Sequence, residues 1–240
     1  MGDIEFHLGL LPNRALAECV ALGQLAETCG YAGVWLADSH SVFRDAYAIL
    51  ANLATTTTRI RLATGVTQTV TRHPAVLANS WATLQEACGG RAMLGIGVGE
   101  SAVRNLGLKP ERLAAFETKV RTIRALLKGE EVEYEGHAIR MPWSEFDVPI
   151  IMACSGPKSL QLGGRIADGV LFQVGSSPAF VRYALDNIRA GAESSGRRLS
   201  DLKLLMRVAC SVGDDRDAAR EAVKGYAAIG AGTTYATVPR

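Results

Sequence analysis

Polar and small residues stand at the ends of the predicted strands, where an α/β barrel carries its chemistry. Asp38 closes one apolar strand, His40 follows it, and Glu100 follows another apolar strand. In a parallel barrel the carboxyl ends of all strands open onto one mouth, so these side chains are candidate acids, bases or binding groups. A single loop carboxylate is more often a cap, but the shared placement at strand ends favours a site. The same reasoning adds small residues that could bind a cofactor: Thr64, Gly65, Val66, Gly97 and Gly99.

A strand-to-helix junction forms a second candidate site. Ser155, Gly156 and Pro157 are typical of an N-cap followed by a helix start, and Lys158 adds a positive charge. Free backbone amides at a helix N-terminus favour the binding of phosphate groups. An ordinary capped helix would give the same pattern, so both interpretations stay open for this motif alone.

Strand-like and helix-like segments alternate along the whole chain. Short apolar runs predict strands, and apolar residues at helical spacing predict the helices between them. The predicted strands cover residues 4–10, 33–38, 60–68, 92–99, 149–155, 169–174 and 203–212. The predicted helices cover residues 14–29, 44–56, 74–88, 110–127, 157–166, 178–194 and 214–229, with a small hairpin excursion near 130–141.

This alternation requires parallel strands with right-handed crossovers, in an open doubly wound sheet or a closed barrel. Seven βα units favour an α/β fold of the TIM type, a (β/α)8 barrel that lacks the eighth βα unit. We interpret residues 1–240 as a single domain, because no linker rich in Pro, Gly or Ser divides them. Without an eighth unit the first and seventh strands keep unpaired edges, which predicts instability or association with another copy of the chain.

Several chemistries are excluded by the residue patterns. The four histidines include no His-x-His pair and no His-Glu-x-x-His, so no metal site is expected. The run Gly95–Glu100 lacks the third glycine of a dinucleotide fingerprint. The five cysteines contain no Cys-x-x-Cys pair, and we predict that they are small, reduced core residues.

The balance of charges and the length of the apolar runs argue against nucleic-acid and membrane partners. The chain has 26 basic and 24 acidic residues, so neither a nucleic-acid partner nor a polybasic membrane anchor is expected. The longest apolar runs, such as residues 92–98, are far shorter than the roughly 18 to 20 residues that span a bilayer. Asp3 and Glu5 stand where a secretory signal would carry basic residues, so we expect a cytoplasmic protein.

Five motifs, in order along the chain, resemble those of the bacterial luciferase-like superfamily. The similarity is greatest to its deazaflavin-dependent branch, which includes methylenetetrahydromethanopterin reductase. The motifs are Val34–Asp38, Ala63–Thr67 with Arg72–Pro74, Gly89–Arg91 leading to Gly95–Ser101, Ser155–Lys158, and Ile166–Gly169.

The resemblance implies a barrel that holds FMN or the deazaflavin coenzyme F420 at its strand ends and passes hydride to or from a small organic substrate. It implies a non-proline cis peptide near Gly65-Val66, in a bulge behind the central ring of the cofactor. By the same resemblance, Asp38 and Glu100 would lie near the ring or the substrate. Ser155, Gly156 and Lys158 would lie near the cofactor phosphate.

Three functions stay open at this point. The first is an F420-dependent oxidoreductase, the second an FMN-dependent luciferase-like monooxygenase, and the third a non-catalytic flavin-binding barrel. The third is motivated by the missing eighth unit and by a displaced histidine. Many members of the superfamily place histidine directly after the strand-two aspartate, whereas here Ser39 stands there and His40 follows. The substrate is set by loop side chains and does not follow from the fold.

Overall fold

The computed structural model describes the backbone of residues 4–233, and the chain divides into two compact units, Met1–Ile150 and Ile151–Arg240. Strands and helices alternate in both units, as the apolar pattern predicts. The described residues contain seven βα units, the number expected from the sequence. The interpretation of the whole chain as a single domain stays a prediction.

The first unit contains a parallel sheet in the order β1-β2-β3-β5. Its strands are β1 (His7–Leu10), β2 (Gly33–Leu36), β3 (Arg61–Thr64) and β5 (Ala92–Gly97), and the two-residue β4 (Thr67–Gln68) pairs with β5. The register places Trp35 of β2 beside Gly9 of β1 and Ala63 of β3. Because neighbouring strands run parallel, their carboxyl ends share one edge, which is where the candidate residues of this unit were expected.

Close approach of β5 to β3 requires a residue without a side chain. A Cβ atom on Gly95 would lie 1.9 Å from the backbone oxygen of Thr64 and 2.8 Å from the Trp35 ring. Every residue of β2 and β5 is buried, as expected for parallel strands covered on both faces. The glycine therefore lets the strands pack where a larger residue would push them apart.

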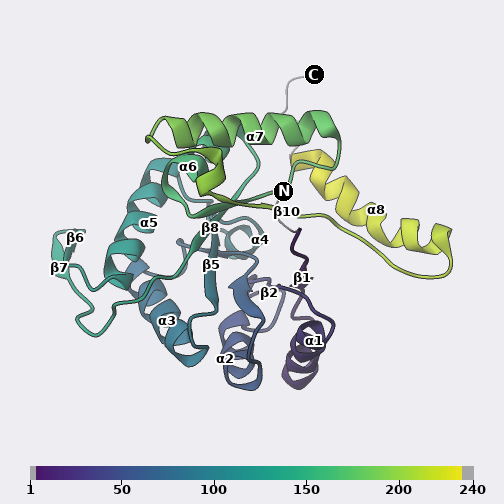
Figure 1. Cartoon of the computed structure of the whole chain (residues 1–240), viewed down its shortest axis with the longest axis horizontal. Helices are drawn as coiled ribbons and strands as arrows, with labels where there is room; N and C mark the ends of the chain where they lie inside the picture. The colour runs from purple at the N-terminus through teal and green to yellow at the C-terminus, as the bar shows by residue number, and fades with distance from the viewer. Residues whose placement is uncertain (1–3, 234–240) are drawn as a thin grey trace. The chain divides into compact units, whose positions relative to one another are not determined.

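The helices of the first unit lie on the outer side of its strands (Figure 1). They are α1 (Leu16–Thr28), α2 (Ala46–Thr56), α3 (Pro74–Ala87) and α5 (Leu113–Leu127), with a short α4 (Ser101–Arg104) after β5. The Asp45 side chain caps α2 by accepting a hydrogen bond from Ala48 N at 2.8 Å. His73 caps α3 in the same way, and Pro74 occupies the first helical position.

Three expectations from the sequence were wrong. Residues 60–68 form two strands, β3 and β4, because the chain breaks the ladder at Gly65 and Val66. The helix predicted from residue 110 begins at Leu113, and α4 was not predicted because four residues are too few to show a helical period. Cys29 and Cys210 are exposed, whereas Cys19, Cys88 and Cys154 are buried.

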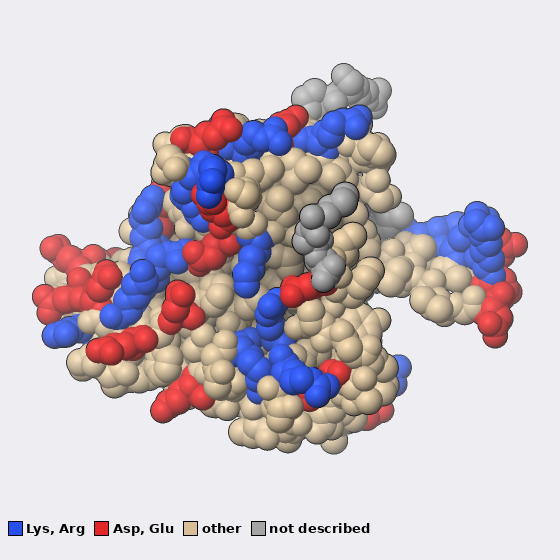
Figure 2. Space-filling view, viewed as in Figure 1, with Lys and Arg blue, Asp and Glu red and all other residues tan. Residues whose placement is uncertain are grey.

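An antiparallel hairpin, β6 (Val132–Tyr134) and β7 (His137–Ile139), lies within the segment 130–141. Its turn residues Glu135 and Gly136 both have positive φ, 50° and 79°, as a type I′ turn requires. Acidic side chains gather over the hairpin in Figure 2, and four of its glutamates are exposed: Glu130, Glu131, Glu133 and Glu135. The hairpin is a solvated excursion from the βα pattern.

The second unit has three parallel strands, β8 (Ile150–Cys154), β9 (Gly169–Phe172) and β10 (Lys203–Met206). Its helices are α6 (Pro157–Ile166), α7 (Pro178–Glu193) and α8 (Arg216–Thr233), with a 3-10 turn η1 (Leu199–Asp201) before β10. The register aligns Gly169 of β9 with Ile151 of β8 and Lys203 of β10. Parallel strands again bring their carboxyl ends to one edge, where α6 begins.

No helix within residues 4–233 has the length and apolar character needed to cross a membrane. Over the same described residues, no three His, Cys, Asp or Glu side chains come together in a way that could hold a metal ion.

Candidate active site

Asp38 lies two residues beyond β2, and its carboxylate is buried at the carboxyl edge of the first unit's sheet. The residue is 2% exposed. Its Oδ2 accepts hydrogen bonds from Thr67 Oγ1 at 2.7 Å and from Arg72 Nη1 at 2.6 Å. Its Oδ1 is also buried and has no hydrogen-bond partner in the described part of the chain. Two hydrogen bonds therefore fix the carboxylate through Oδ2, while Oδ1 remains available to accept a hydrogen bond.

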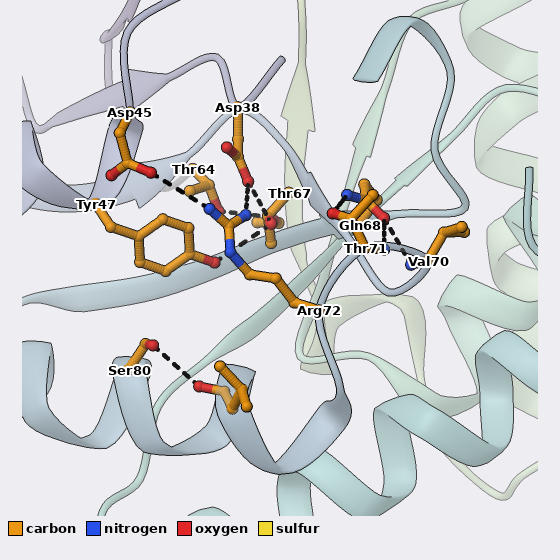
Figure 3. A network of polar contacts seen from close by, with 12 residues as sticks. Asp38, Asp45, Tyr47, Thr64, Thr67, Gln68, Val70, Thr71, Arg72 and Ser80 are labelled. Carbon is orange, nitrogen blue, oxygen red and sulfur yellow. Dashed lines mark hydrogen bonds and ion pairs between the residues drawn. The ribbon is translucent and has the colours of Figure 1, made fainter. Parts of the chain in front are cut away.

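Arg72 supplies the positive charge beside this carboxylate (Figure 3). Its Nη2 lies 3.5 Å from Asp45 Oδ2, and its guanidinium carbon lies 4.3 Å from the centroid of the Tyr47 ring. A cation over an aromatic face is attracted by the ring electrons. The guanidinium therefore has a defined place, with carboxylates on two sides and a ring on a third.

A chain of hydrogen bonds with one possible direction leads to Asp38. The Trp81 indole N–H donates to Tyr47 Oη, and Tyr47 Oη donates to Thr67 Oγ1, both at 3.3 Å. Burial is the main reason that the pKa of Tyr47 rises to about 12, so its hydroxyl keeps its proton at neutral pH. An indole can only donate and each hydroxyl has one hydrogen, so Thr67 is left to donate to the carboxylate.

The peptide bond between Gly65 and Val66 is cis, as the family resemblance implied. It separates β3 from β4. The neighbouring Thr64 is fully buried, and its hydroxyl donates to the Gly95 carbonyl at 2.7 Å. A Cβ atom on Gly65 would lie 3.1 Å from Trp35 Cβ, so the backbone here packs tightly against β2.

The end of β5 contributes backbone to this edge. Gly97 pairs with Gln68 of β4. Gly99 has φ of 90°, and a Cβ atom there would lie 2.3 Å from Val103 Cγ2, so both conformation and space call for glycine. Ser39 Oγ and Ser101 Oγ are 2.7 Å apart, which joins the loop after β2 to the start of α4.

Glu100 and His40 do not join the hydrogen bonds around Asp38. Glu100 is exposed and pairs with Arg104 Nε at 2.6 Å, one helical turn away. His40 is half-buried, and its Nε2 has no hydrogen-bond partner among the described residues. The catalytic roles assigned to these two residues stay predictions.

The predicted anion site lies in the second unit, at the start of α6. The N-cap is Gly156 rather than Ser155, because Pro157 occupies the first helical position and the cap must directly precede it. No side chain caps this end, and Ser159 Oγ donates instead to the Gly156 carbonyl at 2.9 Å. Lys158 is exposed, so the junction offers free amides and a cation to solvent.

Sequence reasoning missed two residues of the site, Arg72 and Tyr47. Arg72 belongs to a motif of the family resemblance but was assigned no role. Tyr47 stands in α2 with the spacing of an ordinary helix residue, so no local signal identifies it. Apart from that motif, the hint for Arg72 was its place as a basic residue four positions after the end of β4.

The fold and the site define an α/β protein whose first unit has a buried carboxylate and a cis peptide at the carboxyl edge of its parallel sheet. The profile of the luciferase-like monooxygenase family matches residues 4–239. The chain belongs to this family.

Relatives of known activity agree with the assignment. The chain is 36% identical to 5,10-methylenetetrahydromethanopterin reductase of Methanolobus tindarius, over 90% of this chain and 68% of that protein. It is 34% identical to an F420-dependent glucose-6-phosphate dehydrogenase of Nakamurella multipartita, over 89% of this chain and 69% of that protein.

A solved structure supports the same conclusion. The coenzyme F420-dependent tetrahydromethanopterin reductase of Methanopyrus kandleri superposes with a TM-score of 0.82 at 28% identity, covering 95% of this chain and 72% of that one. The expected TIM-type fold is thereby confirmed, with seven βα units in residues 4–233. The chain is an oxidoreductase of the luciferase-like class.

Proposed function

We propose that this protein is an F420-dependent oxidoreductase that transfers hydride between coenzyme F420 and a small organic substrate. The observation that carries the proposal is the similarity, over about nine-tenths of the chain, to relatives whose names describe methylenetetrahydromethanopterin reduction and F420-dependent sugar phosphate oxidation. The second candidate is a monooxygenase, because the matching family is described as luciferase-like monooxygenase, and the family resemblance implies FMN as its cofactor.

Each candidate site, taken by itself, offers groups that fit one part of such a cofactor. Asp38 Oδ1 is a buried acceptor without a partner in the described chain, and a deazaflavin ring carries an N–H group that could donate to it. The start of α6 offers amides and Lys158 to a phosphate. When bound, the deazaflavin would supply two-electron hydride transfer.

In this proposal the protein's own groups bind the cofactor and orient it. Asp38 accepts a hydrogen bond, Arg72 balances its charge, and Tyr47 keeps its proton and directs the Thr67 hydroxyl. Thr64, Gly65 and Val66 present backbone at the strand end, where Gly97 of β5 pairs with Gln68 of β4. The substrate is a small molecule whose identity the fold does not set.

Titration of the purified protein with F420 and, separately, with FMN tests the proposal. Quenching of F420 fluorescence at micromolar protein, with no comparable binding of FMN, is the expected result. Binding of FMN alone would favour the monooxygenase. Failure to bind either cofactor would contradict both functions.

Replacing Lys158 with glutamate is expected to weaken F420 binding about ten-fold or more. The substitution reverses a charge at a helix N-terminus where anions are favoured, and one factor of ten is about 1.4 kcal/mol. The dissociation constant is measured by fluorescence titration at two salt concentrations, and the effect should shrink at high salt. Lys128→Glu, an identical change on an exposed residue at the end of α5, should leave binding unchanged. If the two variants changed the dissociation constant equally, the start of α6 would not be the site that binds the phosphate.

We also propose that the protein acts in the cytoplasm and associates with another copy of itself. The support for association is an exposed apolar set in and after β10, with Leu204 39%, Met206 41% and Val208 56% exposed. Sedimentation velocity at micromolar concentration should show a species larger than the 25.5 kDa monomer. A single monomeric species that unfolds cooperatively would count against it.

A further inference from the structure

Arg72 is the cation that joins Asp38 to the rest of the polar network in the first unit (Figure 3). Its Nη1 contacts Asp38 Oδ2 at 2.6 Å and its Nη2 contacts Asp45 Oδ2 at 3.5 Å. The Tyr47 ring lies beneath the guanidinium, 4.3 Å from the guanidinium carbon. With 21% of its side chain exposed, Arg72 has little freedom to turn away.

Both donors to Asp38 reach the same oxygen. Arg72 and Thr67 converge on Oδ2, while Oδ1 has no hydrogen-bond partner in the described chain although it is buried. An ionised carboxylate can accept about four hydrogen bonds, and a buried acceptor left unpaired is unfavourable. A carboxylate held by one oxygen, with the other buried and unused, is arranged to receive a further donor.

Arg72 supplies the charge compensation for Asp38. The Asp38 side chain has no exposed surface, and a buried carboxylate without a cation is strongly unfavourable. Thr67 donates as a neutral hydroxyl, with its direction set by Tyr47, so it orients Asp38 without balancing its charge. Asp45 lies on the far side of the guanidinium and holds Arg72 rather than Asp38.

We propose that Arg72 is a positioning residue for the cofactor, acting through Asp38. It balances the charge of the buried carboxylate and holds Oδ2, so that Oδ1 accepts a hydrogen bond from an N–H group of the bound deazaflavin ring. This inference rests on the proposed F420 function and extends it to a residue that has no predicted contact with the cofactor itself.

A double-mutant cycle on F420 binding tests the role of Arg72. The dissociation constant is measured by fluorescence titration for the wild type, Arg72→Met, Asp38→Asn and the double variant. Arg72→Met should weaken binding about ten-fold to a hundred-fold, the range expected for losing a charge-assisted hydrogen bond. In the Asp38→Asn background the same change should add less than about two-fold, because Arg72 then has no carboxylate to position.

Two further variants separate positioning from structure. Arg72→Lys keeps the charge and should recover part of the affinity, whereas Arg121→Met removes an exposed arginine of α5 and should change nothing. If Arg72→Met fails to fold, Arg72→Lys takes its place in the cycle, because it keeps a positive charge beside the carboxylate. Its loss of affinity should then disappear in the Asp38→Asn background.

The outcomes are distinct. The role of Arg72 would be overturned if its substitution raised the dissociation constant for F420 by the same factor with and without Asp38. It would also be overturned if Arg72→Met left the dissociation constant unchanged. Either result would leave the F420 function intact. A wild-type protein that does not bind F420 would overturn the proposed function and the positioning role together.

Discussion

Replacing Arg91 with methionine is expected to lower the free energy of unfolding by about 3 to 5 kcal/mol, the cost of leaving several buried acceptors without a charged donor. The guanidinium donates to four backbone carbonyls, those of Cys88, Ile60, Ala54 and Thr57, and to the Thr57 hydroxyl. These groups belong to the ends of α2 and α3 and to the approach to β3. One side chain thus joins the turn after α3 to the stretch 54–60, which lies 31 to 37 residues earlier in the sequence.

Urea denaturation of the two proteins measures this loss, and the melting temperature should fall by roughly 2 to 4 °C per kcal/mol. Methionine keeps most of the aliphatic stem, so the change reports on the lost donors rather than on a cavity. Arg121→Met is the matched control, because its exposed ion pair with Glu117 one turn away is worth at most about 0.5 kcal/mol. Similar stabilities of the Arg91 and Arg121 variants would show that the carbonyls find other donors.

Replacing Gly191 with alanine is expected to destabilise the second unit by about 3 kcal/mol, the upper part of the range for overpacking. A Cβ atom on Gly191 of α7 would lie 1.9 Å from the backbone oxygen of Gln161 in α6. The contact is reciprocal, since a Cβ atom on Gly164 of α6 would lie 2.1 Å from the backbone oxygen of Ile188 in α7. The two helices therefore meet backbone to backbone, and a single methyl group must separate them.

Gly225→Ala provides the control for helix propensity. Gly225 is an exposed residue of α8, and a Cβ atom there would have no neighbour within 4 Å among the described residues beyond its own stretch of helix. Alanine should therefore stabilise by about 0.5 to 1 kcal/mol. Thermal unfolding followed by circular dichroism compares the two variants. A neutral or stabilising effect of Gly191→Ala would mean that α6 and α7 do not approach as closely as described.

The order and type of the elements followed from the sequence alone. Strands buried on both faces appear as short apolar runs, as in β2 and β5, and the helices between them show a period of 3.6 residues. Helix starts at Pro74, Pro157 and Pro178 were predicted to the residue. Proline lacks an N–H and has a fixed φ, so it marks the first turn of a helix locally, without help from the rest of the fold.

Part of the candidate site was also predictable. Asp38 stands after a strand, and parallel strands bring such residues to one edge whatever their partners are. Lys158 and Gly156 stand at a helix start that proline identifies. The cis peptide at Gly65-Val66 came from the family resemblance, since nothing in the local residue types requires it.

The partners of the site residues were decided only by the tertiary structure. Asp38 and Arg72 are 34 residues apart in the chain, and Tyr47 and Thr67 are 20 apart. Local patterns report which residues are apolar and where the chain turns, but not which side chains meet across a sheet edge. The sequence therefore made Glu100 a candidate and assigned no role to Arg72, whereas folding paired Glu100 with Arg104 in solvent and Arg72 with a buried carboxylate. The physical reason is that burial and hydrogen-bond direction are set by strand register and by side chains from remote segments.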